Sequence, residues 1–378
     1  MLFTIVYSNL IIKYSFACFV PDTGQKKCYD EKREIPCPSH GKPYYGQDAQ
    51  YETNKRSYTK LDKSGRTLSD SARSWSMVKD NVTGLIWEVK TNDGSIHDKN
   101  IKYNWEDSRQ KFTKELNSSR FGNSSDWRIP DLKELSSIIN NGIHDPSIDA
   151  QFFPNTISHD YWSSTTSQYN TNDAYIMNFN KGFCFRFNKD DSYHVRAVHS
   201  GQSESIDNND GTITDKSTGL IYQRFIDNND GTITDKSTGL IWQKENSEKK
   251  MVWKQALEYC EDLRLNDHSD WRLPNVEELR SIIDFSKCNP AINTNFFPNT
   301  IATRTFYWSS TTYAYNTEAA RGVDYYYGDD IMFPKSTAAY VRAVRSGHSQ
   351  SFGDLVIGLL KQVLYYLIQL LKFIFILG

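Results

Sequence analysis

The apolar positions in the C-terminal half of the chain follow two spacings, which predict two kinds of element. A spacing of three and four residues, typical of one helix face, is shared by Trp253, Ala256, Leu257 and Cys260. The same spacing follows Pro274 and Asn275, residue types that favour a helix start, and it joins Val276, Leu279, Ile282 and Ile283. The β-prone runs 232–234 and 240–242 flank a turn with Asp, Ser and Gly, which predicts a hairpin. The pattern predicts an α+β domain with two helices beside a small, mostly antiparallel sheet.

This pattern occurs twice along the 378-residue chain. Four phrases recur in the same order, 144 to 146 residues apart: SDWR at 125 and 269, FFPNTI at 152 and 296, YWSSTT at 161 and 307, and VRAV at 195 and 341. A repeat of this length indicates a duplicated domain rather than a solenoid of short units. The predicted organisation is a Cys-containing leader (18–70), a first domain (71–201), a linker (202–225) and a second domain (226–348).

A shorter phrase is also written twice, because residues 206–221 recur unchanged at 226–241. The second copy runs into Trp242, as the matching phrase of the first domain runs into Trp87, so it belongs to the second domain. The first copy is followed by no predicted helix, and an isolated hairpin buries too little to be stable. We expect it to be a local duplication within the linker that pairs as an extra edge hairpin on either domain.

Both ends of the chain are apolar. Residues 1–17 end in Ser15, Phe16 and Ala17, which predicts a signal peptide or N-terminal anchor and an extracellular, cell-surface or periplasmic location. Residues 349–378 predict an apolar helix with a narrow polar stripe. Such a helix spans a membrane with its stripe buried in an oligomer, or lies in the membrane interface, unless it is a translation artefact.

Charge and cysteine content indicate which partners and which disulfide bonds to expect. The net charge of −2 and the lack of a basic run give no reason to expect a nucleic-acid partner. Six cysteines in an exported chain suggest disulfide bonds. We expect one bridge between Cys28 and Cys37, which are close and flanked by turn residues. We expect a second bridge between Cys260 and Cys288, which bracket a helical segment.

One oxygen-rich turn is a candidate calcium site. Asp227, Asn229 and Asp230 precede Gly231, and carboxylate and amide oxygens on a tight turn are ligands that Ca²⁺ accepts. Their spacing departs from that of an EF-hand loop, so a solvated turn is the alternative. No nucleophile–base pair, HExxH motif or phosphate-binding loop is present, so no enzyme activity is expected.

The segments between YWSST and VRAV are rich in Tyr, Asn and Asp, the residue types of adaptable recognition surfaces. The candidate ligand contacts of the second copy are Tyr313, Tyr315, Asn316, Tyr325, Tyr326, Tyr327, Asp329 and Asp330. Those of the first copy are Tyr169, Asn170, Asn172 and Tyr175. The alternative is an ordinary antiparallel sheet, which also favours Tyr.

The ordered phrases DGTITDKSTGLIW, WKQALEYC, DWRLPNVEEL, FFPNT, YWSST and VRAVR resemble the Lcl C-terminal domain family, named for a bacterial collagen-like adhesin. The resemblance implies two tandem C-type-lectin-like domains and an exported surface protein for binding and adhesion, with no established catalysis. Some members bind sulfated polysaccharides. Both domains here are slightly acidic, so a neutral glycan or a protein ligand is an equally good expectation.

Two alternatives to a cell-surface binding protein remain at this stage. One is a structural or assembly protein of the cell envelope. The other is an enzyme of the formylglycine-generating type, which shares the lectin-like fold and needs a reactive cysteine late in the domain. Cys184 is the candidate for that role, and only the first domain has it.

Overall fold

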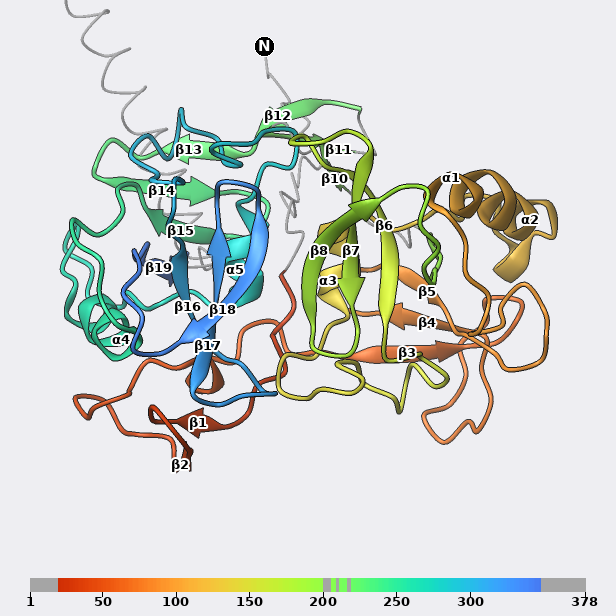
Figure 1. Ribbon diagram of the computed structural model, residues 1–378, viewed down its shortest axis with the longest axis horizontal. Coiled ribbons are helices and arrows are strands. Elements are labelled where there is room, and N and C mark those ends of the chain that lie inside the picture. The colour runs from red at the N-terminus through yellow and green to blue at the C-terminus, as the bar shows by residue number, and fades with distance from the viewer. Residues whose placement is uncertain (1–19, 200–204, 209–210, 216–218, 348–378) are drawn as a thin grey trace, which may run out of the picture.

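The computed structural model describes residues 20–199, 205–208, 211–215 and 219–347 (Figure 1). The predicted signal peptide (1–17) and the predicted apolar C-terminal helix (349–378) lie outside these residues. No helix in the described part of the chain is both long enough and apolar enough to cross a lipid bilayer.

The first domain consists of two antiparallel sheets and short helices. One sheet has the order β3 (Tyr58–Leu61), β4 (Met77–Asp80), β5 (Ile86–Glu88) and β9 (Val198–His199). The other has the order β6 (Asp160–Thr166), β7 (Asp173–Asn178) and β8 (Phe183–Asn188). The helical segments are α1 (Trp105–Asp107), a π-helical turn (Ser108–Phe112), α2 (Thr113–Ser118) and α3 (Leu132–Ser137).

The second domain repeats this arrangement. Its sheets have the orders β13 (Phe225–Asp227), β14 (Thr232–Asp235), β15 (Leu240–Gln243), β19 (Val344–Ser346), and β16 (Tyr307–Thr312), β17 (Ala319–Asp324), β18 (Asp329–Pro334). Its helices are α4 (Trp253–Asp262) and α5 (Val276–Ser281). The expected tandem duplication is therefore confirmed, and the chain is mostly β, with shorter helices than an even α+β mixture would have.

The domain boundaries differ from those predicted. β3 belongs to the first sheet, although residues 58–61 were assigned to the leader, because Tyr58 to Leu61 pair with Asp80 to Met77. β13 likewise begins at Phe225, inside the predicted linker. The four-stranded sheet of each domain ends with the last strand of that domain. This strand, β9 or β19, pairs with β5 or β15, the strand that precedes the first helix of the domain.

The starts of α3 and α5 are each determined by a capping residue. The side chain of Asp131 accepts from the N–H of Glu134 at 2.8 Å, and the Glu134 carboxylate accepts from the N–H of Asp131 at 2.9 Å. Asn275 and Glu278 form the same reciprocal pair. Such a capping box satisfies two of the free backbone donors at a helix start.

Tryptophans at equivalent positions of the two copies fill the core of each domain. Trp105 and Trp253 begin the long helices, and their indole N–H groups donate to the carbonyls of Ser163 and Ser309 at 2.9 and 2.8 Å. The two copies thus encode the same interior contact. Buried indoles with a satisfied N–H contribute large apolar area at no polar cost.

The first copy of the duplicated phrase forms a sheet of its own, with the order β10 (Ser205–Asp207), β11 (Thr212–Asp215) and β12 (Ile221–Gln223). It does not extend the edge of either domain sheet, so the expected edge hairpin is wrong. The phrase carries three strand-forming segments, and these pair with one another in the register that β13, β14 and β15 also adopt.

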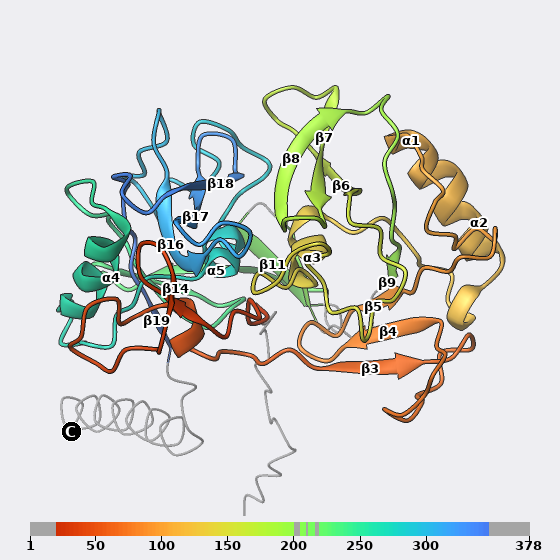
Figure 2. The same cartoon turned by 60° about the horizontal axis from the view of Figure 1, so that its bottom comes forward.

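The leader precedes the first domain in sequence but packs mainly on the second (Figure 2). It contains β1 (Cys28–Tyr29), β2 (Glu34–Ile35) and the short 3₁₀ helix η1 (Asp48–Gln50). The Gln25 side chain donates to the carbonyl of Thr312 at 2.7 Å and accepts from its N–H at 2.9 Å. The Tyr51 hydroxyl donates to Glu261 at 2.6 Å.

The cysteines confirm one predicted disulfide and contradict the other. Cys28 and Cys37 are bonded within the leader. Cys260 is a free thiol buried on α4, whereas Cys288 is free and exposed. The predicted Cys260–Cys288 bridge is therefore wrong, because the helix turns Cys260 into the core and the later loop leaves Cys288 at the surface.

Replacement of Cys28 and Cys37 by serine is expected to cost about 2–3 kcal/mol, the value for closing a loop of roughly ten residues. The loss should fall on the leader, because the bridge lies there. Hydrogen exchange of residues 20–51 measures it. Cys288→Ser serves as a control and should change stability by less than about 0.5 kcal/mol, since the side chain is exposed. Unchanged leader protection in the double variant would contradict the prediction.

Candidate functional site

The two domains meet along a contact surface that we call the domain seam. It is formed by α3 and the β7–β8 hairpin of the first domain and by α5, β17 and β18 of the second. In Figure 1 the sheets β6–β8 and β16–β18 occupy the centre of the molecule. Helices α1 and α2 lie at one outer end and α4 lies at the other. Most of the predicted ligand contacts belong to this central region.

The seam is made of equivalent contacts from the two copies. Tyr175 and Arg321 occupy matching positions, as do Lys181 and Tyr327. The Tyr175 hydroxyl donates to the carbonyl of Tyr327 at 2.5 Å, and the Arg321 guanidinium donates to the carbonyl of Lys181 at 2.5 Å. Each domain therefore holds the hairpin turn of the other, as the subunits of a two-fold symmetric dimer do.

A buried ionic cluster lies at the centre of the seam. The Arg280 guanidinium donates to Asp330 at 2.7 Å and also contacts Glu277, and all three side chains are at most 5 % exposed. Asp330 also accepts from the N–H of Cys184 at 3.1 Å. The buried Asp330 carboxylate is thus occupied by Arg280 of its own domain and by the first-domain Cys184 N–H, and the prediction that it contacts a ligand is wrong.

Three predicted tyrosines are also enclosed. Tyr325 and Tyr175 are buried in the core that runs through the seam, and Tyr313 is 7 % exposed. Tyr175 lies on β7, Tyr313 directly follows β16, and Tyr325 begins the turn after β17. These three rings cannot present a face to a ligand in solution, which corrects their predicted role.

The remaining predicted residues lie at the surface and form two groups that we call the rim clusters. In the first, Tyr169 of the first domain, 61 % exposed, meets Tyr327 of the second with ring centroids 4.8 Å apart. Arg186 lies 4.1 Å from the Tyr327 ring and pairs with Asp329 at 2.8 Å. Tyr326 contacts Tyr327 at 4.4 Å. The seam therefore joins predicted residues from both copies.

The second rim cluster surrounds Tyr315, which is 55 % exposed. The Lys181 ammonium of the first domain lies 4.1 Å from its ring, and the His144 ring lies 5.4 Å away. The predicted Asn316 next to it is also exposed. Asn170 and Asn172 are exposed on the loop before β7, where the Asn170 side chain donates to Asp173 at 3.0 Å.

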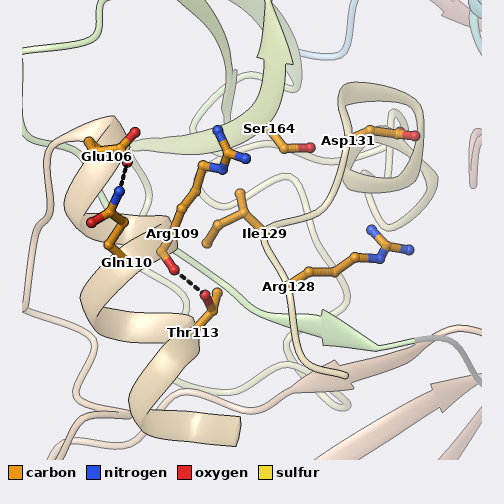
Figure 3. Close-up of a pocket in the computed structure, with 8 residues that line it drawn as sticks. All are labelled: Glu106, Arg109, Gln110, Thr113, Arg128, Ile129, Asp131 and Ser164. Carbon is orange, nitrogen blue, oxygen red and sulfur yellow. Dashed lines mark hydrogen bonds between the residues drawn. The ribbon is translucent and has the colours of Figure 1, made fainter. Parts of the chain in front are cut away.

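A pocket of about 550 Å³ opens in the first domain, away from the predicted residues (Figure 3). It is lined by residues of the helical segment 105–118, of the loop 127–131 and of β6. These residues are Glu106, Arg109, Gln110, Thr113, Arg128, Ile129, Asp131 and Ser164. Figure 3 shows Arg109 and Ile129 between the helix and the loop. Burial and the neighbouring Glu134 carboxylate raise the pKa of Asp131 to about 7. Acidic and basic groups thus face the same space.

The proposed calcium turn is occupied by its own hydrogen bonds. The Asp227 carboxylate pairs with the Lys244 ammonium at 2.6 Å. Asp230 accepts from the N–H of Thr232 at 2.9 Å and contacts Asn266. Asn229 donates its backbone N–H to Asp227. No cluster of three or more His, Cys, Asp and Glu side chains that could hold a metal exists among the described residues, and a Ca²⁺ site that includes Asn229 stays a prediction.

Cys184 does not have the environment of a reactive thiol. It is buried in the seam, where desolvation and the adjacent Asp330 carboxylate raise the pKa of its thiol well above the usual value. Reactive cysteines instead have lowered pKa values and partial exposure. The formylglycine-generating alternative is therefore left without its nucleophile at this position.

The seam arginines and the pocket were not foreseen from the sequence. A signal was present in the comparison of the copies, because Arg280 and Arg321 stand where the first copy has Ser136 and Tyr175. A charged residue that appears in one copy only, on a face that is otherwise apolar, indicates a contact specific to that copy.

Two copies of one mostly β domain, joined along a hydrogen-bonded seam beside a buried ionic cluster of the second copy, define a tandem-domain protein with a disulfide-bonded leader. Residues 76–199 and 231–345 each match the Lcl C-terminal domain, and the chain belongs to that family. No curated protein matches the chain significantly.

Proposed function

We propose that this protein is an exported, adhesin-like binding protein that recognises a glycan or a protein through its rim clusters. The observation that carries the proposal is that exposed Tyr169 and Tyr315 each lie in a cluster that also contains a cationic side chain, with contributions from both domains. Tyr rings offer flat amphipathic area at low entropic cost, which suits recognition of varied ligands. A ring of this kind also suits the apolar face of a sugar.

Further features support the proposal without bearing on the ligand. The Cys28–Cys37 disulfide is typical of oxidising compartments, consistent with an extracellular or periplasmic site. The family resemblance supports a C-type-lectin-like fold for each domain and a role without catalysis. The apolar segment 349–378 would attach the protein to a membrane, alone or as an oligomer.

A glycan array probed with the purified protein, with Ca²⁺ and again with a chelator, tests the proposal. We expect binding to one glycan class that survives the chelator, because the aspartates of the Asp227–Asp230 turn are hydrogen-bonded internally. The variants Tyr169→Ala and Tyr315→Ala should each weaken binding about tenfold, the loss of an aromatic anchor. Ile301→Ala, which removes another exposed apolar side chain, should leave binding unchanged. Binding that vanishes with the chelator would move recognition to a metal site.

A second candidate function is self-assembly on the cell envelope, which one observation favours. β12 is an edge strand of its small sheet, and Ile221 on it is 66 % exposed. Exposed apolar edge strands are templates for pairing with another chain. A failed array together with oligomers that dissociate in Ile221→Lys would favour this function over ligand binding.

A further inference from the structure

The pocket of the first domain has an equivalent in the second. Arg128, Ser164 and Thr165 match Arg272, Ser310 and Thr311 in the repeat. The local geometry is the same in both, since the Thr165 and Thr311 hydroxyls accept from the first backbone N–H of α3 and α5 at 3.0 and 3.1 Å. The backbone and these three side chains are therefore arranged alike in the two faces, which differ in what covers them and in the residues of the neighbouring helix.

In the second domain the leader covers this face. The Thr311 hydroxyl donates to the Asp48 carboxylate at 2.6 Å, and the Arg272 guanidinium lies 5.2 Å from the Tyr51 ring. The face is closed off from solvent, so the Arg272 side chain is only 5 % exposed. A carboxylate and an aromatic ring three residues apart thus occupy the site.

In the first domain the same face is open. The Arg128 side chain is 42 % exposed, although its ion pair with Glu134 matches that of Arg272 with Glu278. Ser164 and Thr165 are half-buried where Ser310 and Thr311 are buried. The Arg109 guanidinium lies 4.7 Å from the Trp105 ring and has no ion-pair partner within the described part of the chain. A cation and a hydroxyl are left facing the pocket.

We propose that this pocket binds a segment of a partner protein that forms a short 3₁₀ turn and carries a carboxylate and, three residues later, an aromatic side chain. The carboxylate takes the Thr165 hydroxyl and the Arg109 guanidinium, and the ring lies on Arg128. The leader of the same chain occupies the equivalent site of the second domain, and its contacts show how such a segment would bind.

One difference between the copies determines which charge the pocket prefers in the bound segment. Glu106 stands where the second domain has Lys254, whose ammonium lies 5.5 Å from the ring of Tyr44. The pocket should therefore prefer a cationic residue at the position of Tyr44, four residues before the carboxylate. This preference distinguishes the partner segment from the leader, which has a tyrosine at this position.

A labelled peptide of residues 43–54 that carries Tyr44→Lys tests the proposal by fluorescence polarisation with the full chain. We expect saturable binding that weakens at least about tenfold in the protein variant Arg109→Ala and with the peptide variant Asp48→Asn, because each removes a charge-assisted contact. Ser164→Tyr should block binding by filling the pocket. Arg264→Ala, which removes an exposed arginine after α4, is the control and should leave binding unchanged.

Thermal unfolding of each variant shows whether its fold is intact, and Arg109→Ala removes no ion pair. Absence of saturable binding would overturn the proposal, as would binding that persists in both Arg109→Ala and Ser164→Tyr. Loss of peptide binding in Tyr169→Ala alone would place the peptide at the rim clusters and also overturn it. Displacement of the peptide by a glycan that itself requires Arg109 would assign the pocket to a sugar instead.

Discussion

Arg280→Met is expected to lower the free energy of unfolding by about 3–5 kcal/mol, the cost of leaving buried charges without their partner. Asp330 and Glu277, which both belong to the second domain, would then lie at the seam with no Arg280 guanidinium between them. The carbonyl of Gly182, which the guanidinium contacts at 3.3 Å, would also lose a donor. Because the cluster also hydrogen-bonds the first domain, through the Asn141 side chain and the Cys184 N–H, the variant should separate the unfolding transitions of the two domains.

Urea unfolding followed by tryptophan fluorescence and by far-UV circular dichroism measures both effects. Arg186→Gln is the matched control, because Arg186 pairs with Asp329 at the outer part of the same seam, where both side chains are 19 % exposed. It should cost about 1 kcal/mol or less. A loss below about 1 kcal/mol for Arg280→Met would show that the seam does not depend on this arginine.

The triple variant Arg280→Met, Glu277→Leu, Asp330→Leu tests the reason for the loss. Replacing a whole buried ionic cluster with apolar side chains is often neutral or stabilising, whereas removing one member is not. We therefore expect the triple variant to recover most of the stability lost in Arg280→Met. A triple variant as unstable as the single one would mean that packing, and not the unpaired carboxylates, causes the loss.

The attachment of the leader is expected to weaken as the pH rises from about 4 to about 7. Burial raises the pKa of Asp48 to about 7, although hydrogen bonds from Thr311 and Thr23 partly oppose the shift. The pKa of an unfolded Asp is about 3.9. A carboxyl whose pKa is raised on folding stabilises the fold fully below its unfolded pKa, and that stability is lost as the pH rises through the folded pKa. Roughly three pKa units correspond to about 4 kcal/mol.

Other groups titrate in the same range, so the measurement is a difference between proteins. Lys335 donates to the carbonyl of Asp30 at 2.7 Å, and burial lowers its pKa to about 7, so its contribution changes in the opposite direction. Asp48→Asn removes only the Asp48 part. The difference in urea stability between Asp48→Asn and the unmodified protein should grow in favour of the variant as the pH rises. A difference that is constant between pH 4 and pH 7 would contradict the prediction.

Part of the candidate site was predictable, because the composition of the segments between YWSST and VRAV identified Tyr169, Tyr315 and Tyr327 as candidate contacts. The cations that lie beside their rings could not be predicted. Lys181 and Arg186 belong to the first domain, whereas Tyr315 and Tyr327 belong to the second. No local pattern records a contact between residues more than 130 positions apart, and the seam that creates it depends on how two whole domains pack.

The sequence by itself determined the repeat, the helix starts and the local bridge between Cys28 and Cys37. Each depends on short-range physics: the spacing of apolar side chains, a capping side chain three residues from its partner, and a loop short enough to close. The two copies could therefore be aligned residue by residue before any fold was known.

Only the tertiary structure decided which equivalent residues are covered. Arg128 and Arg272 pair with equivalent glutamates, yet Arg272 is buried under the leader and Arg128 lines an open pocket. Burial results from long-range packing, and a duplicated sequence placed next to different neighbours has different surfaces. The same reason moved Tyr325 and Asp330 from candidate ligand contacts to the interior of the seam.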